Sequence, residues 1–314
     1  MLDILFEIVF PLVLLGLLLI IFISGIIKKK PERQFMTFHE FIKDWLGDHG
    51  QAHKLDEQFE QMKGDIAGKM YMPITYKGAK MFIKLGLSPN KVSIMNLIFS
   101  FLIFYAIIML GKGHNLDLLS QQPFYGSWFI PLAFFVLFTG IIDGIDGSIA
   151  RLLDIKSKSG AWFDNVIDRI SDTLLLVCFI PTSFMILPVN GSYLDFRWMV
   201  WTNILLIFIY EYMRARHEGL GLHETKPYMG ERITRFLVCF TFFLMYGVSS
   251  FAVLISYSIN PVSAIKWTNS HSWLTTWTML IFQISLLIIM VLSAIPFARY
   301  IWKNLKKMDN TKTD

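Results

Sequence analysis

Charged residues are scarce in this chain. Of its 314 residues, 17% are Asp, Glu, Lys or Arg, whereas 54% are hydrophobic. A soluble domain carries about 25% charged residues. The mean hydropathy of +0.50 and the grouping of apolar residues into blocks therefore predict a membrane protein rather than a soluble protein with a large core.

Cysteine is nearly absent as well. Cys178 and Cys239 both lie within apolar blocks and form no CxxC pair. This excludes a disulfide framework and a thiolate metal site, so we interpret both as small packing residues. The chain also has no internal repeat and no low-complexity tract.

Long apolar segments are what the chain has in abundance. A membrane-spanning helix takes about 20 mostly apolar residues. Seven segments qualify: 4–27, 91–111, 127–150, 160–181, 198–216, 233–257 and 274–298. The first starts with acidic residues and ends in three lysines, unlike a cleavable signal peptide with its basic start. We therefore interpret it as an uncleaved anchor.

The basic residues predict the orientation of these spans. With the N-terminus outside, the external loops 112–126, 182–197 and 258–273 hold three of the 29 Lys and Arg residues. Positive residues accumulate in cytoplasmic loops, so we expect a multi-pass protein of a prokaryotic plasma membrane with a cytoplasmic tail. The net charge of +5 then reflects topology and attraction to anionic lipid, and no nucleic-acid partner is expected.

Two polar stretches separate the first span from the second. Residues 31–68 are interpreted as a cytoplasmic helix or linker, and their histidines, His39, His49 and His53, as solvated side chains. In residues 69–86, apolar side chains interleave with lysines. That pattern is typical of a helix lying in the membrane interface.

Carboxylates gather where the third and fourth spans meet the cytoplasmic side. Asp143 and Asp146 are three residues apart, and Asp164 and Asp168 are four apart, so each pair shares a helical face. A short Lys-rich turn between the spans makes the helices antiparallel neighbours. We therefore expect the four carboxylates to converge near the membrane surface.

Such a cluster repels itself unless a cation binds. Carboxylate oxygens suit hard ions, and Mg²⁺ commonly binds carboxylates together with substrate phosphates. Two ions about 4 Å apart form a common clamp for displacement at phosphorus. Solvation at the interface would explain one carboxylate but not four on facing helices, because ionisable residues within spans mark functional sites. We predict two ions, Mg²⁺ or Mn²⁺, held by Asp143, Asp146, Asp164 and Asp168.

The carboxylates belong to a longer motif, D-x2-D-G-x2-A-R-x8-G-x3-D-x3-D, which resembles the signature of the CDP-alcohol phosphotransferase family. All its fixed positions are present: Asp143, Asp146, Gly147, Ala150, Arg151, Gly160, Asp164 and Asp168. The resemblance implies an all-α, polytopic membrane bundle of six helices, a homodimer in most members, preceded by an interfacial helix. Residues 69–302, with the interfacial helix at 69–86, would supply that domain. The anchor 1–30, the linker 31–68 and the basic tail 303–314 lie outside it.

The resemblance also implies a chemistry. A CDP-linked lipid, with diacylglycerol or an ether-lipid analogue, is the donor, an alcohol attacks the lipid-side phosphorus, and CMP leaves. Asp143, Asp146 and Asp164 would hold metal, while Asp168 would contact the second metal and act as the general base. The donor would be contacted by Asn90, Gly147, Ala150, Arg151 and Gly160. Asn90 comes from the stretch 85–93, which resembles the segment that opens the first bundle helix in many members.

Two further stretches, 211–221 and 230–235, resemble phosphatidylinositol-phosphate synthases and their archaeal ether-lipid counterparts, although His217 replaces a small residue expected there. Guanidinium groups bind phosphate in bidentate fashion. We therefore predict a pocket for the acceptor phosphate formed by Arg214, Arg216, Arg232 and Arg235. Isolated arginines would instead be explained by the accumulation of positive residues on the cytoplasmic side.

Three functions remain open. The first is transfer of a phosphatidyl or archaetidyl group to inositol phosphate. The second is the same chemistry with glycerol 3-phosphate, serine or another alcohol as acceptor. The third is a cation transporter that uses membrane carboxylates, which we rank last because transporters place their sites near the bilayer midplane and often show inverted repeats.

Overall fold

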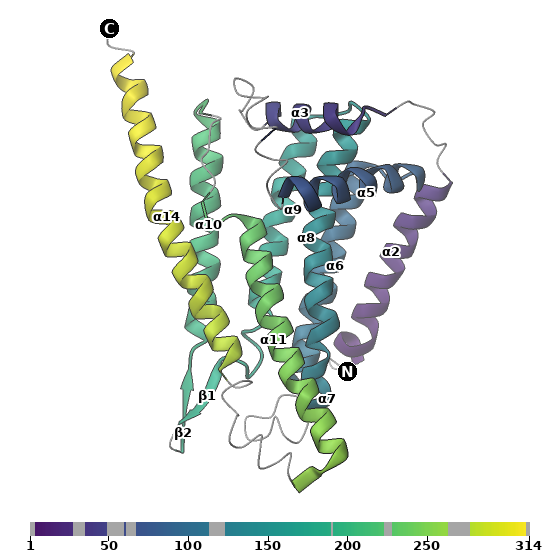
Figure 1. Ribbon diagram of the computed structural model, residues 1–314, viewed down its shortest axis with the longest axis vertical. Helices are drawn as coiled ribbons and strands as arrows, with labels where there is room; N and C mark the ends of the chain where they lie inside the picture. The colour runs from purple at the N-terminus through teal and green to yellow at the C-terminus, as the bar shows by residue number, and fades with distance from the viewer. Residues whose placement is uncertain are drawn as a thin grey trace. The chain divides into compact units, whose positions relative to one another are not determined.

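The computed structural model describes residues 4–27, 35–48, 60, 67–112, 123–189, 191–222, 228–262 and 277–311. As predicted, regular structure in these ranges is almost all helical (Figure 1). The helices are α2 (Phe10–Ile26), α3 (Phe38–Asp48), α5 (Met72–Lys84), α6 (Pro89–Lys112), α7 (Pro123–Ser127), α8 (Phe129–Leu152), α9 (Lys158–Val177), α10 (Arg197–Gly219), α11 (Arg232–Ile259) and α14 (Thr278–Thr311). Two π-helical segments, η1 (Leu5–Val9) and η3 (Ala67–Tyr71), precede α2 and α5.

Each of the seven predicted spans coincides with a helix. Five helical segments in the described ranges are long and apolar enough to cross a membrane: Leu5–Ile26, Pro89–Gly111, Tyr125–Leu152, Arg232–Ile259 and Thr278–Asn310. The other two predicted spans, α9 and α10, fall outside this set because polar and charged side chains interrupt their apolar sequence. The all-α membrane bundle is confirmed, and the protein is an integral membrane protein.

The described chain divides into two compact units. The first consists mainly of Met1–Leu102 and Phe138–Ser171. The second consists mainly of Ile103–Leu137, Asp172–Leu222 and Lys226–Asp314. Helices α6, α8 and α9 contribute residues to both.

In the first unit, one apolar core joins the N-terminal span to the helices that carry the motif. Its buried side chains come from α2, α3, α5, α6 and α8, and include Leu14, Phe41, Phe82, Val92 and Ile149. Gly86 has a φ of 74°, and a Cβ there would collide with the backbone of Gly25. Two glycines therefore let the end of α2 meet the turn after α5 backbone to backbone. The extra span is thus built into this core.

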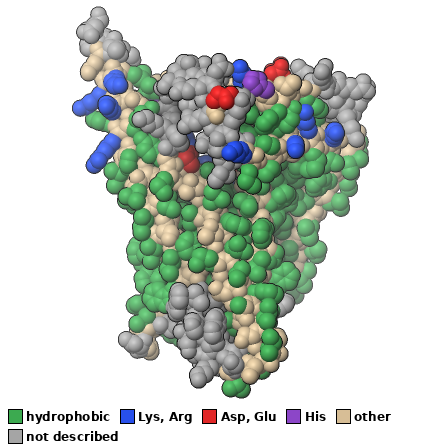
Figure 2. Space-filling model, viewed as in Figure 1, with side chains coloured by type: hydrophobic (Ala, Val, Ile, Leu, Met, Phe, Trp, Pro, Cys, Tyr) green, Lys and Arg blue, Asp and Glu red, His purple; other side chains and the backbone are tan. Residues whose placement is uncertain are grey.

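Helices α3 and α5 run across the direction of α2, α6 and α8 in the first unit (Figure 1). On α5, one face is buried, including Met72, Ala79 and Phe82, while Lys77 and Lys84 are exposed. The charged side chains visible on this unit gather at the end where α3 and α5 lie (Figure 2). This arrangement fits the helix predicted in the membrane interface at 69–86.

Helix α3 is the helical part of the predicted linker 31–68. Thr37 and Glu40 form a capping box: Thr37 N–H donates to Glu40 Oε2 at 2.7 Å, and Glu40 N–H donates to Thr37 Oγ1 at 3.3 Å. His39 is exposed, as expected, whereas His49 and His53 lie outside the described residues. The domain boundaries themselves stay a prediction.

The second unit has an aromatic core in which α14 packs against α10 and α11. The rings of Phe129, Phe179, Phe184, Phe243 and Tyr246 meet at centroid distances of 4.9 to 6.0 Å. Cys178 and Cys239 are free and buried, in agreement with their interpretation as packing residues.

One element was not predicted. Strands β1 (Ile186–Val189) and β2 (Ser192–Asp195) pair antiparallel within the loop expected at 182–197. Gly191 follows Asn190 in the sequence and has a φ of 80°. An Asn-Gly dipeptide is a strong signal for a tight hairpin turn, so this dipeptide could have predicted the hairpin from the sequence.

Candidate active site

The carboxylates predicted to bind metal lie on two neighbouring helices of the first unit. Helix α8 ends at Leu152 and α9 begins at Lys158. Between them, Ile155 N–H donates to Ala150 O at 2.9 Å, and Gly160 N–H donates to the Ser157 hydroxyl at 3.1 Å. This short turn, with its serine cap on α9, produces the antiparallel pair that the sequence predicted.

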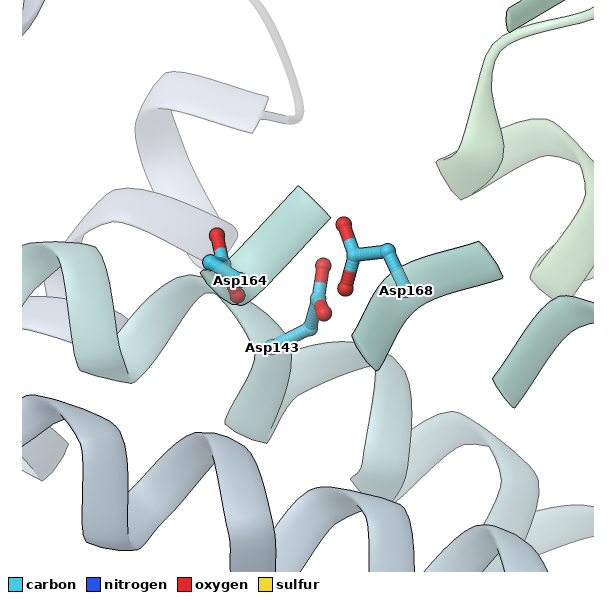
Figure 3. A group of neighbouring side chains, drawn as sticks. All are labelled: Asp143, Asp164 and Asp168. Atoms are coloured by element: carbon cyan, nitrogen blue, oxygen red, sulfur yellow. The ribbon is translucent and has the colours of Figure 1, made fainter. Parts of the chain in front are cut away.

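Asp143, Asp164 and Asp168 point toward one another (Figure 3). One oxygen from each lies within 4.8 Å of the others, and all three residues are half-buried. A group of carboxylate oxygens at this spacing is the donor set that Mg²⁺ and Mn²⁺ prefer. The residues present therefore fit a hard divalent cation.

Two polar side chains of α6 hold the carboxylates of α8. The Asn96 amide donates to Asp143 Oδ1 at 3.3 Å, and the Ser93 hydroxyl donates to Asp146 Oδ2 at 2.5 Å. Both donors are buried, as is Asp146. Such contacts orient metal ligands. Asp146, the fourth predicted ligand, is not part of the 4.8 Å group, and its metal role stays a prediction.

Arg169 lies beside the cluster. Its Nη2 is 3.9 Å from Asp168 Oδ2, which is a long ion pair. Arg169 was not among the predicted site residues, because it is not part of the motif. The pair offsets part of the negative charge of the cluster.

A cavity of about 430 Å³ opens beside these carboxylates in the first unit. Pockets for small molecules typically measure about 300–1,000 Å³. All five residues predicted to contact the donor line it: Asn90, Gly147, Ala150, Arg151 and Gly160. Asp146 and Asp164 line it as well. A Cβ added to Gly147 would meet no protein atom within 4 Å, so this glycine leaves room for a ligand rather than for protein packing.

Four charged side chains form a network at the edge of this cavity. Arg151 Nε is 2.9 Å from Asp44, and its Nη2 is 2.7 Å from Asp48. Lys156 Nζ bonds to both carboxylates, at 3.0 and 3.1 Å. Asp48, Arg151 and Lys156 all line the cavity. Of these four charged residues, only Arg151 was a predicted site residue.

These contacts shift two pKa values. Partial burial raises the pKa of Asp48, but hydrogen bonds from Arg151 and Lys156 outweigh it, so that the pKa lies below its usual range. Desolvation lowers the pKa of Lys156, but its bonds to Asp44 and Asp48 raise it further, and the net shift is upward. Both residues are therefore charged at neutral pH.

The predicted acceptor arginines lie in the second unit, and three of them bond to carboxylates. Arg235 is 4% exposed and donates to Asp172 at 2.8 Å and to Glu211 at 2.9 Å. Arg232 donates to Asp172 at 3.2 Å. Arg214 pairs with Glu231, and its Nη1 is 3.9 Å from Glu211.

Arg216 differs from the other three arginines because it is exposed, in the last turn of α10. Its phosphate-binding role, like that of the others, stays a prediction. Asp172, which accepts hydrogen bonds from both Arg232 and Arg235, was not among the predicted site residues.

A family model described as CDP-alcohol phosphatidyltransferase matches residues 86–284. An uncharacterized protein of Aquifex aeolicus is 37% identical over 107 residues, which is 31% of this chain and 50% of that protein. The archaetidylinositol phosphate synthase of Pyrococcus horikoshii is 26% identical over 197 residues, which is 62% of this chain and 89% of that protein. The match thus spans half the length of the first relative.

Two solved structures of the phosphatidylinositol phosphate synthase of Mycobacterium tuberculosis also match. One, with CDP-DAG bound, has a TM-score of 0.45 and 18% identity, and covers 73% of this chain and 94% of that chain. The other, in complex with manganese and citrate, has a TM-score of 0.46 and 19% identity, and covers 73% and 88%. The family model covers well over half of the present sequence and includes the whole motif, so this chain belongs to the CDP-alcohol phosphatidyltransferase family.

Proposed function

We propose that this protein transfers a phosphatidyl or archaetidyl group from a CDP-linked lipid to the hydroxyl of inositol phosphate and releases CMP. The observation that carries the proposal is the cavity in the first unit, which brings the five expected donor contacts together with Asp146 and Asp164. Membership of the family sets the transporter hypothesis aside.

The reaction needs a base, because a hydroxyl is a weak nucleophile at neutral pH. In the proposal, Asp168 accepts the proton of the acceptor hydroxyl. The acceptor oxygen bonds to the lipid-side phosphorus as the bond to the CMP oxygen breaks. Asp168 is half-buried, and one of its oxygens lies within 4.8 Å of oxygens of Asp143 and Asp164, which supports a role for it beside the proposed metal ions.

Asp143, Asp146, Asp164 and Asp168 would hold two divalent ions, either Mg²⁺ or Mn²⁺. Bound ions supply charge neutralisation and Lewis acidity at the pyrophosphate. The chain's own contribution is to fix the carboxylates, which Asn96 and Ser93 do through hydrogen bonds. Small residues at 147, 150 and 160 leave space for the nucleotide, and Arg151 offers it a guanidinium.

The choice of inositol phosphate rests on two supports. The stretches 211–221 and 230–235 resemble the inositol-phosphate branch of the family. The relative from Pyrococcus horikoshii is named an archaetidylinositol phosphate synthase. In the proposal, Arg214, Arg216, Arg232 and Arg235 bind the acceptor phosphate, and glycerol 3-phosphate is the leading alternative acceptor.

We further propose a homodimer in the plasma membrane of a prokaryote, with the site facing the cytoplasm. The distribution of Lys and Arg between the predicted loops supports this orientation. Cysteine labelling from either side of the membrane would test it. Labelling of a residue in the 153–157 turn only from the outside would contradict it.

One assay tests the proposed reaction. The purified protein is incubated with CDP-diacylglycerol or its ether analogue, Mg²⁺ or Mn²⁺, and one acceptor at a time, and CMP release is measured. We expect release with inositol phosphate and little with serine or glycerol 3-phosphate. If CMP were released with glycerol 3-phosphate alone, glycerol 3-phosphate would replace inositol phosphate as the proposed acceptor. If no acceptor gave CMP release, the proposed chemistry would be refuted.

A further inference from the structure

The helix α3 lies outside the segment that matches the family, 86–284, yet it supplies part of the cavity wall. Asp44 and Asp48 are four residues apart on α3 and share one face. Both carboxylates bond to Arg151, which belongs to the signature motif, and to Lys156 in the turn that follows α8. The two carboxylates thus connect α3 to charged residues that line the cavity.

The position of these carboxylates is not explained by the stability of α3 itself. Asp44 and Asp48 lie in the second half of the described helix. Acidic side chains near a helix C-terminus interact unfavourably with the helix dipole. Their contacts with Arg151 and Lys156 offset such a cost.

The anchorage of α3 is firm. Phe41 and Leu46 are almost fully buried in the core of the first unit, with Ile149 and Leu152 of α8 in the same core. The Tyr76 hydroxyl donates to Met36 O at 2.8 Å, which ties the start of α3 to α5. A helix held in this way fixes its side chains in place, as a scaffold for a binding site requires.

Arg151 needs such a scaffold. It is 8% exposed, and its guanidinium also lies 5.7 Å from the ring of Phe41. A buried charge without a partner is strongly unfavourable. Without the carboxylates, a long and flexible arginine side chain would turn toward solvent and leave the cavity wall.

We propose that Asp44 and Asp48 are positioning residues for the donor site, which hold the Arg151 guanidinium and the Lys156 ammonium at the cavity wall where they meet the phosphates of the CDP-linked lipid. The proposal rests on the proposed function, because it takes the CDP-linked lipid as the occupant of the cavity. Under this proposal, α3, which precedes the segment that matches the family, contributes to donor binding.

The two carboxylates could instead compete with the anionic donor for the cations, and an experiment can distinguish competition from positioning. If the carboxylates merely competed with the anionic donor for Arg151 and Lys156, their removal would tighten donor binding. If they position the two cations, their removal weakens it. The buried site of Arg151 and the firm anchorage of α3 favour positioning.

The test uses the full-length protein with Asp44→Asn or Asp48→Asn, each of which leaves one carboxylate for Arg151 and so preserves its burial. Donor and acceptor are varied in turn in the CMP-release assay. The matched control is Glu40→Gln, which makes the same chemical change on the same helix, and glutamine can keep the capping box. Folding of every variant is checked by size-exclusion chromatography.

We expect each asparagine variant to raise the donor KM about tenfold, the scale of one charge-assisted hydrogen bond. The kcat and the acceptor KM should stay close to those of the wild type, and Asp48→Glu should restore most of the donor affinity. In a background that carries both Arg151→Met and Lys156→Met, Asp44→Asn and Asp48→Asn should lose most of their effect, because they act through these two cations.

A donor KM that is unchanged or lowered in both variants would overturn the proposal while the proposed function stands, as would an equal rise with Glu40→Gln. A full effect of both variants in the background that lacks both Arg151 and Lys156 would also overturn it. A wild-type protein that released no CMP with any acceptor would refute the proposed function and the positioning role with it.

Discussion

The ion network around Arg235 gives the sharpest test of how this membrane protein uses its charges. Arg235 is 4% exposed and bonds to Asp172, which is 6% exposed, to Glu211 and to the carbonyl of Gly230. The substitution Arg235→Ala removes one positive charge and leaves two carboxylates short of a partner. Breaking a buried pair in this way costs about 3–5 kcal/mol.

That cost is large compared with the total stability of a folded protein, which is about 5–15 kcal/mol. An unfolding entropy of about 2.1 cal/mol/K per residue gives about 1.5 °C per kcal/mol for a chain of 314 residues, so we expect Arg235→Ala to lower the melting temperature by roughly 5–8 °C. The assay is thermal unfolding in detergent, followed by size-exclusion chromatography with fluorescence detection. The double variant Arg235→Met with Glu211→Gln should recover part of the loss, because it removes charge from both sides of the network.

Arg216 provides the matched control, since it is also a predicted acceptor contact but is exposed. Arg216→Ala should leave the melting temperature near that of the wild type. If it binds the acceptor phosphate, its acceptor KM should rise by about tenfold to a hundredfold, with the donor KM unchanged. The reasoning is refuted if Arg235→Ala melts like the wild type, or if Arg216→Ala destabilises the protein as strongly as Arg235→Ala.

The remaining predictions concern the carboxylates and one further arginine. Excess EDTA should abolish CMP release and Mg²⁺ or Mn²⁺ should restore it; full turnover in EDTA would contradict the metal site. Asp168→Asn should nearly abolish turnover while CDP-lipid binding stays measurable, because the other carboxylates remain. If the variant mainly lost CDP-lipid binding, the assignment of Asp168 as the general base would be contradicted. Asp143→Asn and Asp146→Asn should each weaken both turnover and donor binding, and normal kinetics in either variant would remove that ligand from the site. Arg214→Lys should retain much of the acceptor affinity that Arg214→Ala loses, as acceptor KM values would show.

The carboxylate group was predictable because its geometry is local. Asp143 and Asp146 lie within one helical turn, as do Asp164 and Asp168, and a short turn joins the helices that carry the two pairs. Periodicity and loop length therefore sufficed to bring Asp143, Asp164 and Asp168 together. The apolar spans were predictable for a similar reason, since the length and composition of one segment decide whether it can cross a bilayer.

The contacts that hold the site were not predictable, because they join residues far apart in the sequence. Arg151 and Asp48 are separated by 103 residues, and Asn96 and Asp143 by 47. No local pattern marks such partners. The acidic residues of α3 look like any solvated helix face until tertiary packing places them against Arg151.

The hairpin at Ile186–Asp195 was missed for a different reason. Residues 182–197 lie between two long apolar segments that were predicted to span the membrane, so they were interpreted as a loop without regular structure. The Asn190–Gly191 dipeptide was a local signal for a tight turn. Strands of four residues are too short to be predicted from the alternation of polar and apolar side chains alone, so the turn residues were the better evidence for the hairpin.

The arginine–carboxylate network of the second unit and the motif carboxylates of the first unit differ in their charge balance. This difference bears on their roles. In the second unit, Arg214, Arg232 and Arg235 bond to Asp172, Glu211 and Glu231, so that three positive charges meet three negative ones. A balanced network of this kind, in which Arg235 and Asp172 are buried, holds helices in place. Arg216 is exposed, so in the proposed function it is the arginine that meets the acceptor first.

In the first unit the balance is different. The motif contributes four carboxylates, and the contact of Arg169 with Asp168 offsets about one of them, at the long distance of 3.9 Å. An excess of negative charge within apolar helices is costly unless cations offset it. The proposed divalent ions would offset that excess, and the phosphates of the proposed donor would in turn be drawn to the ions. The charge of this group thus fits the proposed metal and phosphate chemistry.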